Sequence, residues 1–299
     1  MTMMLDESAV RRLLRIDEVI EAMEGALADF SSGKVVQPVR SAVPVDEHDG
    51  FLGVMPAYAG ALGVKLVTFY PRNQGIPTHL ATIMLFKPET GEPLVIMDGR
   101  LITEVRTAAV SAVATRLLAR PESSVLAILG SGVQARSHLE ALRMVRHFND
   151  VRVWSPHHAE AFAREFKLRA TASAEEAVTG ADVVVTVTSS ARPVLFGAWL
   201  SPGVHINAVG ACRPSWRELD DVTLRRARIY VDSRDAANQE SGDIIAAGRI
   251  FAEIGEVVAG SKPVRQSAEE ITLFKSLGLA VEDVVTANLV YQKALAAAA

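Results

Sequence analysis

A glycine-rich loop between an apolar strand and a helix is the feature that most constrains the fold of this chain. The run Val125–Leu129 predicts a buried strand, and Gly130-Ser131-Gly132-Val133-Gln134-Ala135 leads from it into a predicted helix. Glycines let a backbone approach a pyrophosphate closely, and the amides at a helix N-terminus supply donors and partial positive charge. This strand–turn–helix context favours a dinucleotide site over a structural turn. We expect its contacts to come from Gly130, Ser131, Gly132, Val133 and Gln134.

Strand-like and helix-like runs alternate after Pro121, and this rhythm predicts a doubly wound parallel sheet of the Rossmann type. Helices are expected to follow the first two strands, one to about His147 and one through Phe166. We therefore assign residues 121–278 to a dinucleotide-binding domain. Its strands are expected at Val125–Leu129, Val151–Trp154, Val183–Val187, His205–Val209, Ile229–Val231 and Ile271–Phe274.

The first 120 residues show a different pattern. A helix is expected from Asp17, as its cap, to about Phe30, and a second one over Leu101–Ala119. Between them, β-rich runs follow one another without helices, which predicts a mostly antiparallel sheet in a second, α+β domain. The Ala-rich C-terminal helix, residues 279–299, lies outside the strand–helix rhythm and is expected to complete this domain. The β-rich runs are Val35–Val45, Phe51–Tyr58, Leu62–Tyr70, His79–Phe86 and Leu94–Met97.

Composition excludes several classes of protein. A hydrophobic fraction of 49% and a charged fraction of 22% are typical of a globular chain rather than a disordered one. The net charge of −4, without a basic block, argues against a nucleic-acid partner. No stretch reads as a membrane span, and the N-terminus shows no signal-like apolar run. The single Cys212 and the histidines without metal-ligand spacing predict a cytoplasmic protein with no disulfide and no metal.

The residues after the second strand of the Rossmann-type sheet bear on which dinucleotide binds. A carboxylate there would accept the ribose hydroxyls of NAD, but this chain has Ser155, His157 and His158. Such side chains can donate to a ribose phosphate, so NADP(H) is the expected cofactor, with NAD(H) as the alternative. The histidines would otherwise only cap the next helix. Further contacts are expected at the carboxyl edge of the sheet, unless these residues form ordinary strand-end turns: Thr188, Ser189 and Val209.

Seven further segments carry a resemblance to a known family. They are Gln37–Arg40, Leu52–Tyr58, Lys65–Tyr70, Arg106–Ala112, His205–Ala211, Trp216–Asp221 and Phe274–Gly278. The chain resembles the ketimine reductases of the ornithine cyclodeaminase/mu-crystallin family over nearly its whole length. The resemblance implies a Rossmann domain beside a substrate-binding and dimerisation domain, here residues 1–120 with the helix at 279–299. It also implies a homodimer, a nicotinamide cofactor, and a small cyclic imine or a keto or imino acid as substrate.

The same resemblance assigns roles to three cationic residues. Arg40, Lys65 and Arg106 match positions of the family's substrate pocket, with Lys65 and Arg106 as catalytic residues. A guanidinium can bind a carboxylate through two parallel bonds, and a desolvated lysine can tune proton delivery. Taken singly, each of the three is more often a surface ion-pair partner. Weaker substrate contacts are His79 and Trp216, and the nicotinamide is expected near Thr107, Ser276 and Leu277.

Two positions depart from the family's patterns. Ser155-Pro156 stands where the family's ketimine reductases have an Asn-Arg pair, so an arginine for the ribose phosphate is missing. Ala211 stands where the cyclodeaminases have an aspartate, so ornithine cyclisation is not expected. The resemblance therefore implies NAD(P)H-dependent reduction of the C=N bond of cyclic ketimines and imino carboxylates. The alternatives are reductive amination of an α-keto acid, as in alanine dehydrogenases, and non-enzymatic, NADP-dependent binding of a small molecule resembling a thyroid hormone.

Overall fold

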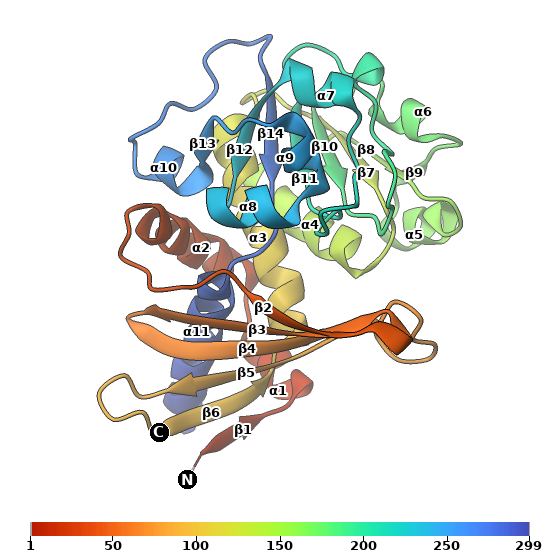
Figure 1. Ribbon diagram of the computed structural model, residues 1–299. Helices are drawn as coiled ribbons and strands as arrows, with labels where there is room; N and C mark the ends of the chain where they lie inside the picture. The colour runs from red at the N-terminus through yellow and green to blue at the C-terminus, as the bar shows by residue number, and fades with distance from the viewer. Residues whose placement is uncertain (1, 299) are drawn as a thin grey trace. The chain divides into compact units, whose positions relative to one another are not determined.

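The computed structural model describes residues 2–298 and divides the chain into two compact units, each built on its own sheet (Figure 1). The first unit contains Met1–Arg106 and Gly278–Ala299, and the second contains Thr107–Leu277. The first border between them falls inside helix α3 (Arg100–Leu118), earlier than the border expected after residue 120. None of the helices within residues 2–298 combines the length and the apolar character that crossing a bilayer requires.

The first unit holds a six-stranded sheet in the order β1-β6-β5-β4-β3-β2. β1 pairs with β6 in parallel and all other neighbours are antiparallel, which confirms the mostly antiparallel sheet. β1 was not expected, because three residues are too few to show a strand period. β2 begins at Ser41 rather than Val35, since Val36 makes only an isolated bridge to Tyr58. The strands are β1 (Met3–Leu5), β2 (Ser41–Val45), β3 (Gly50–Ala59), β4 (Ala61–Phe69), β5 (His79–Phe86) and β6 (Pro93–Asp98).

The helices of the first unit are α1 (Glu7–Leu13), α2 (Ile16–Ser31), the short 3-10 helix η1 (Asp46–His48), the first part of α3, and α11 (Ala280–Ala298). The expected cap at Asp17 is wrong. Arg15 is the N-cap residue of α2, and Asp17 lies in the first turn, where a carboxylate interacts favourably with the helix dipole. α11 packs against α2 and against β3, β4 and β5, and Figure 1 shows it behind the sheet.

β4 shows which face of the sheet α11 covers. Gly63 and Lys65 are buried, whereas Val64 and Leu66 are only half-buried. A Cβ on Gly63 would lie 3.1 Å from a methyl carbon of Val284 in α11, so the Gly63 face is the covered one. Because strand residues alternate between faces, Lys65 points to the α11 side. The other face of β4 presents apolar side chains that stay partly exposed.

The second unit holds an eight-stranded sheet in the order β13-β12-β14-β11-β10-β7-β8-β9. All neighbouring strands are parallel, which confirms the doubly wound sheet. The chain runs from β7 outward to β8 and β9 and then returns to β10 on the other side of β7. The carboxyl ends of β7 and β10 therefore flank the topological switch point, where ligands bind in such sheets. The strands are β7 (Val125–Leu129), β8 (Asp150–Trp154), β9 (Arg169–Ala170), β10 (Val183–Thr186), β11 (His205–Ala208), β12 (Ala227–Val231), β13 (Ala252–Glu253) and β14 (Ile271–Lys275).

Helices pack around this sheet, and the apolar residues of strands and helices form one buried core. The helix after β7 and the helix after β8 end close to their expected positions. The helices are α4 (Val133–Val145), α5 (Ala159–Phe166), α6 (Ala174–Val178), the 3-10 helix η2 (Gly197–Trp199), α7 (Asp221–Arg226), α8 (Arg234–Glu240), α9 (Gly242–Ala247) and α10 (Ile254–Val258).

Candidate active site

Four charged side chains form a buried cluster in the first unit. Lys65 and Arg106 are 1% and 4% exposed, and Glu282 and Asp283 are fully buried. The Lys65 ammonium lies 2.5 Å from Asp283 Oδ2. Arg106 donates from Nε to Asp283 Oδ1 at 2.9 Å and from Nη1 to Glu282 Oε2 at 2.7 Å. Asp283 thus bridges the two cations, and we call these four residues the charged cluster.

Three elements place the charged cluster. Lys65 lies in the middle of β4, Arg106 lies in α3, and the two carboxylates lie in the first turn of α11. The positive end of the helix dipole favours carboxylates at that turn. Sequence reasoning missed both Glu282 and Asp283. A signal was present, because no other charged residue occurs in α11 before Lys293.

Gly278 joins Arg40 to this cluster. Arg40 Nη2 donates to the carbonyl oxygen of Gly278 at 3.1 Å. Gly278 has a φ of +84°, and a Cβ there would lie 2.3 Å from Arg106 Nη1. Only glycine fits, because both the left-handed backbone and the guanidinium exclude a side chain. The structure therefore brings together Arg40, Lys65 and Arg106, the three cations expected in the substrate pocket.

Burial shapes the protonation of these groups. Loss of water lowers the pKa of Lys65 to about 8. Asp283 opposes this shift, whereas the positive charges of Arg106 and Arg40 add to it. For Arg106, burial acts to lower the pKa, but Asp283 and Glu282 outweigh it and the pKa is raised. With Arg40, three cations and two carboxylates meet here while Lys65 is protonated, an arrangement that can bind a substrate carboxylate and deliver a proton.

Two weaker substrate candidates lie elsewhere. His79 is exposed at the start of β5, four residues along the strand from Ile83, the residue that pairs with Lys65. Its ring packs on Phe69 with 4.5 Å between the ring centroids. The structure therefore places His79 outside the charged cluster. Trp216 belongs to the second unit, where the Arg213 guanidinium lies 4.8 Å from the centroid of its ring, and its substrate contact stays a prediction.

The glycine loop of the second unit joins the end of β7 to α4. Gly130 has a φ of +126°, and a Cβ there would lie 2.6 Å from the carbonyl oxygen of Val187, just after β10. Gly132 is the N-cap residue of α4 and makes no side-chain capping bond, so the first amides of the helix are available to an anion. Ser131 Oγ lies 2.8 Å from Ser155 Oγ. The loop forms a backbone cradle at the switch point, and a side chain at Gly130 would collide with the backbone that follows β10.

The two histidines after β8 are exposed, and their ring centroids lie 6.2 Å apart. The amide of His158 donates to Ser155 Oγ at 3.2 Å. His158 is the N-cap residue of α5, but its side chain makes no capping bond, which contradicts a capping role for this ring. Arg136, in α4, forms a bidentate pair with Glu165 in α5.

Thr188, which follows β10, is held by a residue that sequence reasoning missed. Its amide and its hydroxyl both donate to Glu218 Oε1, at 2.8 and 2.6 Å. The hydroxyl also accepts a bond from the Ser190 amide at 3.1 Å. Because the hydroxyl proton is already donated within the protein, this side chain cannot also donate it to a cofactor. Glu218 belongs to a segment that was singled out only for its family resemblance.

The remaining cofactor candidates differ in exposure. The Leu277 amide donates to Asp232 Oδ2 at 2.5 Å, so its backbone is anchored inside the second unit. The contacts of all the remaining candidates with a cofactor stay predictions. Two of them are exposed, two are half-buried and three are buried: Val133 and Ser189, then Gln134 and Val209, then Thr107, Ser276 and Leu277.

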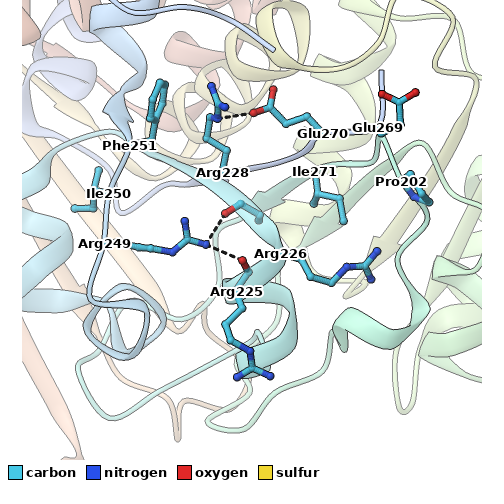
Figure 2. Close-up of a pocket in the computed structure, with 11 residues that line it drawn as sticks. Pro202, Arg225, Arg226, Arg228, Arg249, Ile250, Phe251, Glu269, Glu270 and Ile271 are labelled. Atoms are coloured by element: carbon cyan, nitrogen blue, oxygen red, sulfur yellow. Dashed lines mark hydrogen bonds and ion pairs between the residues drawn. The ribbon is translucent and has the colours of Figure 1, made fainter. Parts of the chain in front are cut away.

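A hollow of about 660 Å³ lies at the amino ends of β12 and β14, where four arginines line it (Figure 2). Three of them are bound within the protein. Arg249 Nη2 donates to the carbonyl oxygens of residues 224, 225 and 227 at 2.7 to 2.9 Å. Arg228 pairs with Glu270, and Arg226 donates to Gly197. In Figure 2 the Arg225 side chain points away from the others. The guanidinium groups do not converge, so this hollow is not a candidate site.

The chain belongs to the ornithine cyclodeaminase/mu-crystallin family, whose model matches residues 1–298. It is 54% identical to the ketimine reductase mu-crystallin of Mus musculus over 286 residues, which cover 91% of each chain. The structure of Thermococcus litoralis Δ1-pyrroline-2-carboxylate reductase with NADH and L-proline is 40% identical. It superposes with a TM-score of 0.95 over 99% of this chain and 98% of that one. An archaeal alanine dehydrogenase dimer with bound NAD is 38% identical, with a TM-score of 0.94 over 100% and 97% of the two chains.

Proposed function

We propose that this chain is an NAD(P)H-dependent reductase of the C=N bond of cyclic imino carboxylates. The observation that carries this proposal is the buried charged cluster with Arg40 beside it. The guanidinium groups of Arg40 and Arg106 suit the carboxylate of an imino acid. Its lysine, with a pKa of about 8, suits a proton donor to the imine nitrogen. The similarity to a ketimine reductase and to a pyrroline-2-carboxylate reductase supports the same reaction.

The glycine cradle fits a nicotinamide dinucleotide. Gly130 and Gly132 leave room for a pyrophosphate, and the N-terminus of α4 offers amides to it. Ser131 and Ser155 would lie beside the adenosine ribose, at the ends of β7 and β8. When bound, the reduced nicotinamide supplies the hydride that reduces the imine carbon. The similarity to proteins with bound NADH or NAD supports this class of cofactor.

The residues of the charged cluster would bind and orient the substrate. Arg40 and Arg106 would hold its carboxylate, because the bonds of Arg106 to Asp283 and Glu282 come from Nε and Nη1 and leave Nη2 for the substrate. Asp283 favours the ammonium form of Lys65, which would hold a proton for the nitrogen. A substrate that arrives already protonated would need only orientation and charge stabilisation from these groups.

A substrate panel with purified protein tests this function. Oxidation of NADPH and NADH is measured with piperideine-2-carboxylate and pyrroline-2-carboxylate, and with pyruvate plus ammonia. We expect faster turnover with the cyclic imines. A reversed preference would establish the second candidate, an alanine dehydrogenase reaction, which the similarity to the archaeal enzyme favours. Tight cofactor binding without any turnover would indicate a non-enzymatic binder. Ornithine should yield no proline, because Ala211 supplies no acid.

We propose NADPH as the preferred cofactor. A ribose 2′-phosphate carries up to about two negative charges, and the exposed His157 and His158 follow β8, where Ser155 stands in place of a carboxylate that would repel it. The preference over NADH should be about 10-fold, or about 1.4 kcal/mol. KM values for both cofactors measure it. His157→Ala and His158→Ala should weaken NADPH and spare NADH, whereas His48→Ala, at an exposed histidine of the first unit, should change neither. If both ring deletions leave KM for NADPH unchanged, the histidines are only surface residues.

We also propose that the chain forms a homodimer through the open face of the first unit's sheet. Val64 and Leu66 in β4, Met84 in β5 and Ile96 in β6 stay partly exposed on this face, although β4 and β5 are interior strands. The dimeric alanine dehydrogenase supports a second copy as the partner. We expect Met84→Asp to yield monomers by light scattering, because a carboxylate would be desolvated in the interface. Leu295→Asp, at an exposed leucine of α11, is the matched control and should stay dimeric. A dimeric Met84→Asp variant would place the interface elsewhere.

A further inference from the structure

We propose that Glu218 is a positioning residue for the dinucleotide: its buried carboxylate ties the carboxyl ends of β10 and β11 together and so fixes one wall of the glycine cradle. The inference rests on the proposed function only in requiring that the cradle bind a nicotinamide dinucleotide. It does not depend on which imino acid is reduced.

The Glu218 carboxylate is fully buried and accepts four hydrogen bonds from two strand ends. Oε1 accepts from the amide and the hydroxyl of Thr188, at 2.8 and 2.6 Å. Oε2 accepts from Thr186 Oγ1 at 2.7 Å and from the Gly210 amide at 2.8 Å. The two threonines come from the end of β10, and Gly210 follows β11. A buried charge is tolerated when its acceptor sites are filled in this way.

These bonds begin where the backbone ladder between the strands ends. The register of β10 and β11 runs to the pair Thr186 and Ala208. Among the backbone bonds of residues 2–298, the last between the two chain segments runs from the Val209 amide to the Thr186 carbonyl, at 2.9 Å. Beyond that point Glu218 supplies the connection between Thr188 and Gly210. Without it, the segments that follow β10 and β11 would lose their common anchor.

Close packing extends this connection to the cradle. A Cβ on Gly210 would lie 2.4 Å from Glu218 Oε1 and 2.2 Å from the Thr188 carbonyl oxygen, so only glycine fits beside the carboxylate. Val187 lies between the two threonines that Glu218 holds, and its carbonyl oxygen faces Gly130 of the cradle, 2.6 Å from the position of a Cβ there. A shift of the β10 end would therefore move the wall against which a dinucleotide is held.

The backbone around Glu218 is itself anchored by hydrogen bonds to other parts of the second unit. Asp243, fully buried in α9, accepts bonds from the Leu219 amide at 3.1 Å and from the Glu218 amide at 3.4 Å. The Glu218 carbonyl in turn accepts from the amides of Val194 and Leu195. The backbone that carries the carboxylate is thus held by bonds that involve neither β10 nor β11. This is the property expected of a positioning group.

Direct measurement of NADPH and NADH binding to the full-length protein tests the proposal. In Glu218→Gln, one carboxylate oxygen becomes an amide nitrogen, which cannot accept the bonds of one pair of donors. We expect the Kd of both cofactors, measured by their fluorescence, to rise by about 10-fold or more, as for loss of hydrogen bonds to a charged group. Imine KM at saturating cofactor should stay close to wild type, because the charged cluster is intact.

Three further variants separate positioning from a general loss of stability. Asp220→Ala, two residues away, removes the acceptor of the Thr223 and Gly197 amides and should lower Tm without changing Kd. Thr186 is fully buried, so a cofactor cannot touch it. Thr186→Val removes one of the four donors to Glu218 and should weaken binding, whereas Thr186→Ser should restore it. This pair carries the test if Glu218→Gln does not fold.

The outcomes distinguish the inference from the proposed function. If the wild-type protein binds neither NADPH nor NADH, both fail. If the wild type binds but Glu218→Gln and Thr186→Val bind equally well, Glu218 is not a positioning residue and the proposed function stands. The same conclusion follows if Asp220→Ala weakens binding as much as Glu218→Gln does.

Discussion

The Arg106→Met variant is expected to lose both catalytic efficiency and stability. Transition-state stabilisation should fall by about 2–5 kcal/mol, as when one partner of a desolvated charge pair is removed. The structure adds a second effect, because Arg106 bonds to two fully buried carboxylates, Glu282 and Asp283. Losing these bonds should lower the free energy of unfolding by about 3–5 kcal/mol. Steady-state kinetics and chemical denaturation measure the two quantities separately.

A second substitution separates the two losses. In Arg106→Met with Glu282→Gln, one buried negative charge is removed along with the cation that balanced it, while Asp283 keeps its contact with Lys65. Part of the unfolding free energy should return, but kcat/KM should not, since the carboxylate clamp is still absent. Wild-type kcat/KM in the single variant would exclude Arg106 from the substrate site.

The Lys65→Met variant should lower kcat by on the order of 10²-fold or more if Lys65 assists proton transfer. The methionine has a similar length and no charge, so the pocket keeps its shape. An increase in KM alone would show that Lys65 only binds the substrate. Rates at saturating imine and cofactor distinguish these results.

The pH profile gives a further readout of Lys65. Burial lowers its pKa to about 8, so the ammonium form, the proton donor, prevails below that pH and is lost above it. We therefore expect kcat to fall as pH rises through about 8. In Lys65→Arg the positive charge persists over the accessible pH range, so this fall in kcat should disappear. In Asp283→Asn the fall in kcat should move to lower pH, because Asp283 raises the pKa of Lys65. If the fall in kcat is unchanged in both variants, it reports the titration of another group.

Local patterns were sufficient to predict most of the strands, although β9 and β13, of two residues each, were not expected. His79–Phe86 and Val125–Leu129 coincide with β5 and β7, because apolar runs between turn residues mark strands without reference to the rest of the chain. The glycine loop was equally predictable, since the close backbone approach that requires glycine depends on only a few neighbouring residues. The cap of α2 and the strand β1 were missed, because neither has a distinctive pattern over so short a stretch.

The partners of the candidate site residues could not be predicted in the same way. Strand alternation showed that Lys65 faces away from Val64 and Leu66, but it could not tell a buried face from solvent. The answer depends on α11, which begins at Ala280 and covers that face. Arg106 and Asp283 are separated by 177 positions in the sequence and are joined only after both elements have packed.

The sequence by itself determined the two kinds of sheet, the strand–loop–helix that can bind a dinucleotide, and three cations that resemble those of a reductase family. Each of these depends on local periodicity, on backbone requirements of single residues, or on matched motifs. Only the tertiary structure decided that Lys65 and Arg106 share Asp283, that Gly278 must lack a side chain beside Arg106, and that Glu218 joins two strand ends. The physical reason is that charge pairing and close packing act between surfaces, and those surfaces are brought together by elements distant in sequence.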